Sequence, residues 1–148
     1  MVRKSKVIIR KKGSSAQIHT ATRRDHALEG LEDYVEAIAL ISSQEGEARV
    51  VSLALQMGVS HVAVIKMISK LQKEGYVNSK PYRAIFLTEK GKRLAERVRK
   101  RHELVVLFLK ALGVSAGVAE RDAEGIEHHV SSETMRAFQR YLDSSVSR

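Results

Sequence analysis

The sequence contains no cysteine and no tryptophan, and it has only one proline and three phenylalanines among its 148 residues. Without cysteine the chain cannot form a disulfide framework, a zinc finger, an iron–sulfur cluster or a thiol nucleophile. Scarce proline and few aromatic residues favour helices over a turn-rich all-β fold. Because 43% of the residues are hydrophobic, the chain can build a globular core, and we predict a mainly α fold.

Long hydrophobic runs are also absent. The longest apolar run near the N-terminus is Val7–Ile9, which is too short for the hydrophobic region of a signal peptide. No segment approaches the roughly 20 apolar residues that a membrane span requires. We therefore predict a cytoplasmic protein that has no membrane partner.

Basic charge is concentrated at the N-terminus. Residues 1–26 carry eight basic residues and one acid, in a chain whose net charge is +9. This segment lacks sustained helical or strand periodicity, so we predict a flexible basic arm. Such an arm would neutralise nucleic-acid phosphates, although a solubilising tail has the same composition. Membrane attachment is disfavoured because no amphipathic apolar face accompanies the charge.

Helical periodicity begins at Glu29, where apolar residues start to recur every three or four positions, and it is interrupted at Gly46. A short helix follows, then a turn at Gly58-Val59 and a second helix with Ser60 as its N-cap. Two helices joined by a tight turn that contains glycine are typical of a helix-turn-helix unit.

A basic hairpin follows the second helix of this unit. Residues 76–77 and 84–87 form two short β-prone runs around a polar turn at residues 78–83. A hairpin in this position is typical of the wing of a DNA-binding domain. We therefore predict a winged helix-turn-helix domain over residues 27–95.

The second helix of the unit is the predicted recognition helix, because the major groove is wide enough to admit one helix. Hydroxyl and cationic side chains at its start and on the wing suit phosphates, an imidazole suits a base edge, and small apolar groups suit thymine methyls. The predicted DNA-contacting residues are Ser60, His61, Val62, Ala63, Lys66, Lys80 and Arg83. The alternative is a winged helix that binds only another protein, which the basic wing and arm disfavour.

A helical region is predicted over residues 96–148. Thr88 is the predicted N-cap of a long helix whose first half is charged and whose second half is apolar, with Gly113 at its end. Two further helices follow, with Ser115 and Ser131 as predicted N-caps.

Three groups of acids and histidines contain the residue types of a metal site. Asp33 and Glu36 share one helix face, and His102 lies where the long helix becomes apolar. The stretch "RDAEGIEHHV" at residues 121–130 places two glutamates and a histidine at positions i, i+3 and i+4. Each group also has an ordinary explanation as a solvated helix face or a packed histidine, and periodicity cannot show that the groups meet.

The motifs "LEDYVEAI", "GYV…YRAIFLTEKGKRLA", "RHELVVLFLKALGV" and "DAEGIEHHVS" occur in order around the helix-turn-helix. Together they resemble the manganese transport regulators of the diphtheria-toxin-repressor family, from about residue 30 to residue 142. The resemblance implies a metal-dependent transcriptional repressor of metal-uptake genes that binds a palindromic operator as a homodimer. It also implies a winged helix-turn-helix domain followed by a small helical dimerisation domain, with the metal bound between them.

Carried over by position, the resemblance implies six metal ligands: Asp33, Glu36, His102, Glu124, Glu127 and His128. It also implies that two ions can be held close together. It assigns no ligand role to His129, for which we predict a structural or indirect role. Glu103 likewise has no ligand role, and we predict that it lies on the surface or acts indirectly.

Manganese is the favoured metal because carboxylate and imidazole ligands suit it, and because acids occupy the positions where iron-sensing relatives tend to use sulfur, Asp33 and Glu124. Fe²⁺, Co²⁺, Zn²⁺ or Cd²⁺ would substitute in vitro. The alternatives are an iron-dependent regulator of the same family, a di-metal carboxylate enzyme, and a winged-helix regulator that senses an organic ligand. Val62-Ala63 departs from the family pattern, which leaves the operator sequence open, and we expect no SH3-like third domain.

Overall fold

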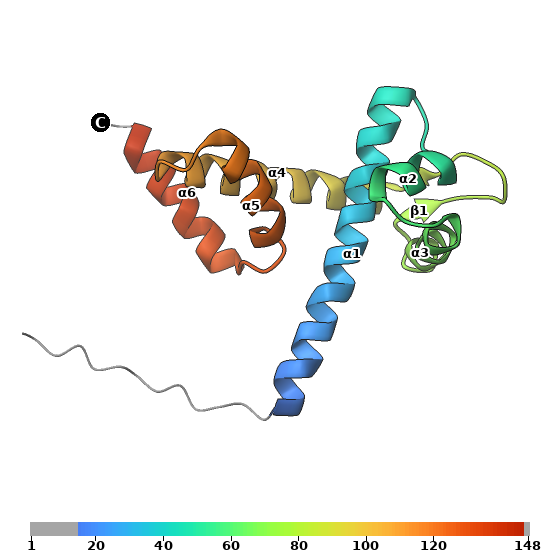
Figure 1. The fold of residues 1–148 in the computed structure, drawn as a ribbon, viewed down its shortest axis with the longest axis horizontal. Helices are drawn as coiled ribbons and strands as arrows, with labels where there is room; N and C mark the ends of the chain where they lie inside the picture. The colour runs from blue at the N-terminus through green and yellow to red at the C-terminus, as the bar shows by residue number, and fades with distance from the viewer. Residues whose placement is uncertain (1–14, 147–148) are drawn as a thin grey trace, which may run out of the picture.

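A computed structural model describes residues 15–146 as six helices and two short strands (Figure 1). In chain order the elements are α1 (Ser15–Glu45), α2 (Val50–Met57), α3 (His61–Lys73), β1 (Val77–Asn78), β2 (Phe86–Leu87), α4 (Glu89–Ala111), α5 (Ala116–Ile126) and α6 (Ser132–Val146). The mainly α fold, a winged helix-turn-helix followed by a small helical domain, is confirmed.

Helix α1 is longer than the sequence pattern predicts. It begins at Ser15, not near Glu29, so residues 15–26 of the predicted arm belong to a helix. This part of the chain contains neither proline nor glycine, and a helix already formed by the packed segment can extend through it without an apolar stripe. Residues 1–14, the rest of the predicted arm, lie outside the described residues.

The helix-turn-helix forms as predicted. Gly58 ends α2 with a φ of 64°, a left-handed conformation that glycine adopts without steric cost. The Ser60 hydroxyl accepts a hydrogen bond from the backbone N–H of Ala63 and so caps α3. Buried side chains of α1, α2, α3 and α4, together with Val77 and Ile85 of the wing, form one core.

The wing is a short antiparallel hairpin in which Val77 pairs with Leu87 and Asn78 with Phe86. Its second strand is extended by a bridge between Ile85 and Ala48, from the connection between α1 and α2. The wing is thus attached to the lobe by backbone pairing as well as by side-chain packing.

The wing also fixes the start of α4. The Thr88 hydroxyl donates to the carbonyl of Gly75 at 2.7 Å and accepts from the N–H of Gly91 at 3.1 Å. At Gly91 a Cβ would lie 2.1 Å from the carbonyl oxygen of Tyr76, so only glycine allows this close approach.

The second lobe consists of the C-terminal half of α4 with α5 and α6 packed against it. Phe108 of α4 stacks on Phe138 of α6 at a centroid distance of 3.9 Å, and Tyr141 meets Phe108 edge-on at 5.5 Å. Ser131 caps α6 by accepting from the N–H of Thr134, whereas Ser115 precedes α5 without a capping hydrogen bond from its side chain.

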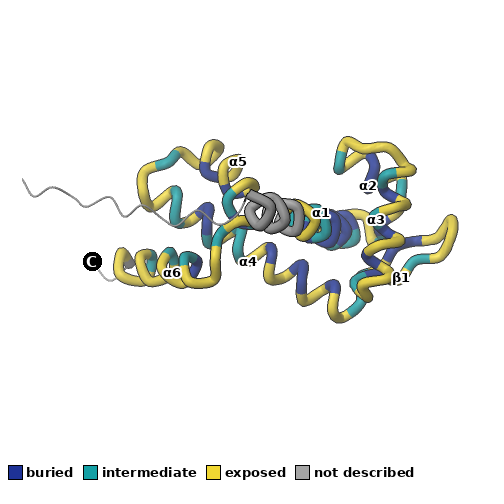
Figure 2. Tube along the Cα trace, turned by 90° about the horizontal axis from the view of Figure 1, so that it is seen from below, coloured by how far each residue is buried: buried dark blue, intermediate teal, exposed yellow. Residues whose placement is uncertain are grey.

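Helix α4 connects the two lobes, and α1 crosses it between them (Figure 1). Figure 2 shows buried positions along α4 at both ends of the helix, one set for each lobe. The junction of α1, α4 and α5 is therefore the place where residues from both lobes meet.

Among the described residues, no single helix is both long enough and apolar enough to cross a membrane. The helices α2 and α3 meet the length and composition requirement only as a pair, and they are bent by 109° at the turn between them.

Candidate metal centre and DNA-binding surface

The predicted metal ligands come from three helices of two lobes. Asp33 and Glu36 lie on α1, and His102 lies on α4 at the beginning of the second lobe. Glu124 belongs to α5, and Glu127 and His128 follow directly as the helix ends. These elements meet at the junction of the lobes, so side chains far apart in the sequence become neighbours.

His102 is surrounded by carboxylates from α5 and its C-terminal cap. Its Nδ1 lies 2.7 Å from Oε2 of Glu127 and 3.6 Å from Oε1 of Glu124. Its Nε2 lies 2.9 Å from Oε2 of Glu120. Ligand atoms of His102, Glu124 and Glu127 all lie within 4.8 Å of one another, which is a spacing that one cation can close.

His128 joins the two lobes through its imidazole, whose side chain is 2% exposed. Its Nδ1 lies 2.7 Å from Oε2 of Glu32, and its Nε2 lies 3.0 Å from Oδ1 of Asp33. Both acids belong to α1. A residue of the second lobe is thus held by carboxylates of the first.

Glu127 gives the strongest indication of a cation site, because its charged side chain is completely buried. Its Oε1 lies 3.3 Å from Nε2 of His128 but makes no hydrogen bond within the described chain. Burial raises the pKa of Glu127 to about 7, despite the opposing influence of His102 and His128. A buried carboxylate oxygen without a hydrogen bond fits a cation ligand.

The surrounding acids raise the pKa values of both histidines, His102 and His128. Hydrogen bonds to Asp33 and Glu32 raise the pKa of His128 to about 10, against the effect of burial. Burial disfavours the imidazolium of His102, but the hydrogen bond to Glu120 and the charge of Glu127 outweigh it and raise the pKa. The acids around His102 and His128 thus make both imidazoles easier to protonate than a free imidazole.

Glu36 lies at the edge of the same group. It lines a cleft of about 770 Å³ together with Asp33 and Glu124. Burial, followed by the nearby charge of Glu124, raises the pKa of Glu36. Its carboxylate is therefore close enough to the others to share their electrostatic environment.

Two acids in this group were not predicted from the sequence. Glu32 is 3% exposed, and it accepts from Arg101 Nη1 at 3.1 Å while it holds Nδ1 of His128. Burial alone would raise the pKa of Glu32, but the hydrogen bond with His128 and the charge of Arg101 lower it. Glu120 contacts His102, one turn before Glu124. The sequence did contain a signal for both acids, because Glu32 precedes Glu36 and Glu120 precedes Glu124 by four residues, which places each pair on one helix face.

Residues predicted to have indirect roles lie outside the His102 and His128 contacts. Glu103 pairs with Arg99 on the exposed side of α4. His129 contacts an acid that His128 does not, since its Nε2 lies 3.4 Å from Oε2 of Glu29.

The predicted DNA-contacting surface consists of residues at the start of α3 and near the tip of the wing. Ser60, His61, Val62 and Lys66 are exposed at the start of α3, and Ala63 is half-buried beside them. Lys80 and Arg83 are exposed near the tip of the wing. His61, Lys80 and Arg83 line one cleft of about 610 Å³ between the two elements.

Two further residues of this surface were not predicted. Arg49, at the start of α2, lines the cleft, and Tyr82 is fully exposed at the wing tip with a φ of 59°. The proximity of Arg49 depends on the bridge between Ala48 and Ile85, which the sequence pattern did not indicate.

Comparison with protein families assigns both lobes. Residues 27–85 match the iron dependent repressor, N-terminal DNA binding domain, and residues 88–146 match the iron dependent repressor, metal binding and dimerisation domain. The boundary between the two matches falls at the start of α4.

Curated relatives point to the same kind of protein. The chain is 47% identical over 116 residues to the transcriptional regulator MntR of Salmonella typhimurium strain LT2, which covers 78% of this chain and 74% of the relative. It is also 47% identical over 116 residues to the transcriptional regulator MntR of Escherichia coli O157:H7, over 78% of this chain and 75% of the relative. These relatives are transcriptional regulators and not enzymes.

Solved structures with a similar fold include the metal-dependent transcriptional regulator MtsR, with a TM-score of 0.69 and 31% identity over 76% of this chain. The manganese regulator SloR has a TM-score of 0.65 and 30% identity over 76% of this chain. This chain spans about half the length of these two, since it covers 53% of each. The chain therefore belongs to the diphtheria-toxin-repressor family of metal-dependent transcriptional repressors, whose DNA-binding and dimerisation domains it contains.

Proposed function

We propose that this protein is a manganese-activated repressor of metal-uptake genes that senses the metal at the junction of its two lobes. The observation that carries the proposal is the buried Glu127 carboxylate. Its Oε1 has no hydrogen bond among the described residues, although it lies among histidines and acids of both lobes. Two similar proteins support the choice of metal: the manganese regulator SloR and a manganese-dependent transcriptional repressor described in complex with manganese.

The six proposed ligands offer only carboxylates and imidazoles, and the chain has no cysteine thiolate to add to them. Oxygen-rich sites of this kind suit Mn²⁺, although Co²⁺, Zn²⁺ and Cd²⁺ would also bind in vitro. Asp33, Glu36, His102, Glu124, Glu127 and His128 would hold the ion. The acidic side chains of Glu36, Glu124 and Glu127 would also provide oxygens for a second ion beside the first.

A bound cation would supply positive charge to the acids of the junction, which otherwise raise the pKa values of His102 and His128. Asp33 and Glu36 move with the DNA-binding lobe, whereas Glu124 and Glu127 move with the second lobe. Side chains that share one ligand restrict the relative motion of the lobes, and the arrangement that binds the ligand best becomes the populated one.

In a homodimer, this restriction would set the separation of the two recognition helices. Major grooves on one side of B-DNA repeat at roughly 34 Å, so a fixed separation near that value, or a multiple of it, favours a palindromic operator. Lys66, Lys80 and Arg83 would contact phosphates, and Val62 and Ala63 would contact thymine methyl groups. We place this function in the cytoplasm.

The proposal is tested by replacing Glu127 with glutamine, which keeps the size of the side chain and removes its charge. The operator is first selected from a random pool of DNA duplexes with the wild-type protein and Mn²⁺. We expect Glu127→Gln to weaken Mn²⁺-dependent operator binding at least tenfold, since loss of even an indirect metal partner has an effect of about 10–100-fold. The protein should remain a folded dimer.

The matched control is Glu103→Gln, which removes an exposed carboxylate of α4 that pairs with Arg99. We expect this variant to respond to Mn²⁺ as the wild type does. Equal Mn²⁺-dependent affinity in wild type and Glu127→Gln would reject the site.

An iron-dependent regulator is the second candidate function, because the matching family models carry an iron-dependent description. The two are separated by measuring operator binding at fixed salt with Mn²⁺ and with Fe²⁺ under anaerobic conditions. Half-maximal DNA binding at a lower free concentration of Fe²⁺ than of Mn²⁺ would favour iron.

A further inference from the structure

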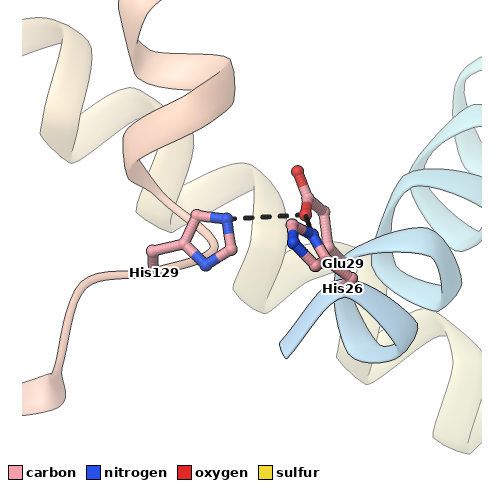
Figure 3. A group of neighbouring side chains, drawn as sticks. All are labelled: His26, Glu29 and His129. Carbon is pink, nitrogen blue, oxygen red and sulfur yellow. Dashed lines mark hydrogen bonds and ion pairs between the residues drawn. The ribbon is translucent and has the colours of Figure 1, made fainter. Parts of the chain in front are cut away.

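Three metal-ligand side chains form a separate group next to the junction: His26 and Glu29 of α1, and His129 of the connection between α5 and α6 (Figure 3). In Figure 3 both imidazoles are directed toward the Glu29 carboxylate. None of the three contacts His102 or Glu127 in the interactions described above. The group therefore requires an explanation of its own.

The distances between the ligand atoms of this group are close to those between neighbouring ligands of one metal ion. Nδ1 of His26 lies 3.2 Å from Oε2 of Glu29, and Nε2 of His129 lies 3.4 Å from the same oxygen. Ligands about 2.1 Å from one ion, at right or tetrahedral angles, are themselves about 3.0–3.4 Å apart. The three ligand atoms all lie within 4.8 Å of one another, and rotation of the two exposed histidines can close the remaining separation.

We propose that His26, Glu29 and His129 form a second divalent-cation site, distinct from the junction site and selective for a different metal. Two imidazoles and one carboxylate make a donor set with more nitrogen than that of the junction, where acids outnumber histidines. Such a set binds Zn²⁺ or Co²⁺ more tightly than Mn²⁺, because affinity for nitrogen ligands rises along the first-row series. Water would complete the coordination on the exposed side.

The proposed site lies next to the junction site but uses different side chains. Glu29 lies one turn before Asp33 on α1, and both residues line the same cleft. His129 immediately follows His128, yet the two imidazoles contact different acids of α1, Glu29 and Asp33. A cation held there would join α1 to the second lobe at an additional point.

The test measures the number of Zn²⁺ ions bound per full-length chain by equilibrium dialysis. It uses a background variant, His102→Ala with Glu127→Gln, in which the junction site has lost two of its proposed ligands. We expect this background to retain one Zn²⁺ per chain. Adding His26→Ala and His129→Ala should remove that ion or weaken it at least tenfold. Adding His61→Ala instead, which removes an imidazole of α3, should leave the Zn²⁺ count unchanged.

Retention of the same Zn²⁺ count and affinity after both histidines are replaced would overturn the proposal. So would failure of the junction-inactivated background to bind any Zn²⁺, provided that its circular dichroism spectrum and dimeric size match the wild type.

A second measurement separates this proposal from the proposed function. In an otherwise wild-type chain, His26→Ala with His129→Ala should leave Mn²⁺-dependent operator binding within about threefold, while Glu127→Gln weakens it at least tenfold. Loss of Mn²⁺ activation in the histidine variant, with no loss of Zn²⁺, would show that these side chains only support His128. Normal Mn²⁺ activation in Glu127→Gln would reject the junction site without affecting the zinc count.

Discussion

The two lobes differ in how much interior they possess. Within the described residues, the DNA-binding lobe contains a core of sixteen buried hydrophobic residues from α1, α2, α3, α4 and the wing. The second lobe has five, contributed by α4, α5 and α6. The first lobe can therefore hold its shape by its own packing, whereas the second has little apolar surface buried within one chain.

The second lobe also leaves large apolar side chains exposed. Leu107 and Leu112 are more than half exposed, and Val118 and Tyr141 are about two-fifths exposed. A dimerisation domain needs such a surface, because association buries what a single chain cannot. Exposed apolar side chains also occur on the DNA-binding lobe, for example Leu55 and Ile65, so the difference lies in the buried cores. We therefore expect the stability of the second lobe to depend more on its partner, and the following predictions test this difference.

The largest effect is expected in the core of the DNA-binding lobe. Ile38→Ala removes a fully buried side chain and should reduce the free energy of unfolding by about 2–5 kcal/mol. Chemical denaturation followed by circular dichroism measures this loss. Leu55→Ala is the control, since Leu55 is 85% exposed and its replacement should change stability by less than about 0.5 kcal/mol. Equal losses in the two variants would contradict the described core.

A smaller effect that depends on concentration is expected in the second lobe. Phe108→Ala removes the aromatic contact that joins α4 to α6, and it should cost about 1–3 kcal/mol because Phe108 is only half-buried. If the lobe is completed by its partner, the melting temperature of this variant should rise with protein concentration. A melting temperature independent of concentration, in a chain that sedimentation shows to be dimeric, would argue against this dependence.

The smallest single step in stability is expected at the junction between the cores, where the metal-free protein should become less stable with each unit of rising pH. Its carboxylate partners raise the pKa of His128 from 6.5 to about 10. The folded state therefore holds a proton that the unfolded state releases, so this stability is complete below about pH 6.5 and is lost as the pH rises toward 10. We expect a loss on the order of 1 kcal/mol per pH unit in this range.

Denaturation of chelator-treated protein at pH 6.5, 7.5 and 8.5 measures this slope. His128→Gln should flatten it, because glutamine cannot take up the proton. An unchanged slope in His128→Gln would assign the pH dependence to other groups.

Local elements were predictable where the physical signal is local. The caps at Ser60, Thr88 and Ser131, the turn at Gly58 and the hairpin of the wing follow from side-chain chemistry within a few residues. The six proposed metal ligands required a family resemblance, because helical periodicity places Asp33 or His102 on a face but does not say which distant face it meets.

The parts that the sequence did not predict depend on tertiary contacts. Glu32 is an acid within a helix, and only the packing of α4 and the end of α5 against α1 shows that it is buried between Arg101 and His128. The extension of α1 back to Ser15 has no apolar stripe for periodicity to detect. The group of His26, Glu29 and His129 depends on both features.

Helix α4 passes without interruption from one core to the other, and Val98 and Val105 are buried in successive cores. Seven residues are almost two full turns, so both valines lie along one line of the helix. One residue inserted between them would rotate the rest of α4 and the second lobe by about 100°. An insertion before His102 would turn its side chain away from α1, and an insertion after it would turn α5 away from His102. The number of residues between Val98 and Val105 thus sets the rotation of one lobe about α4 relative to the other, whereas a residue added in a loop or changed on the surface would leave that rotation unaltered.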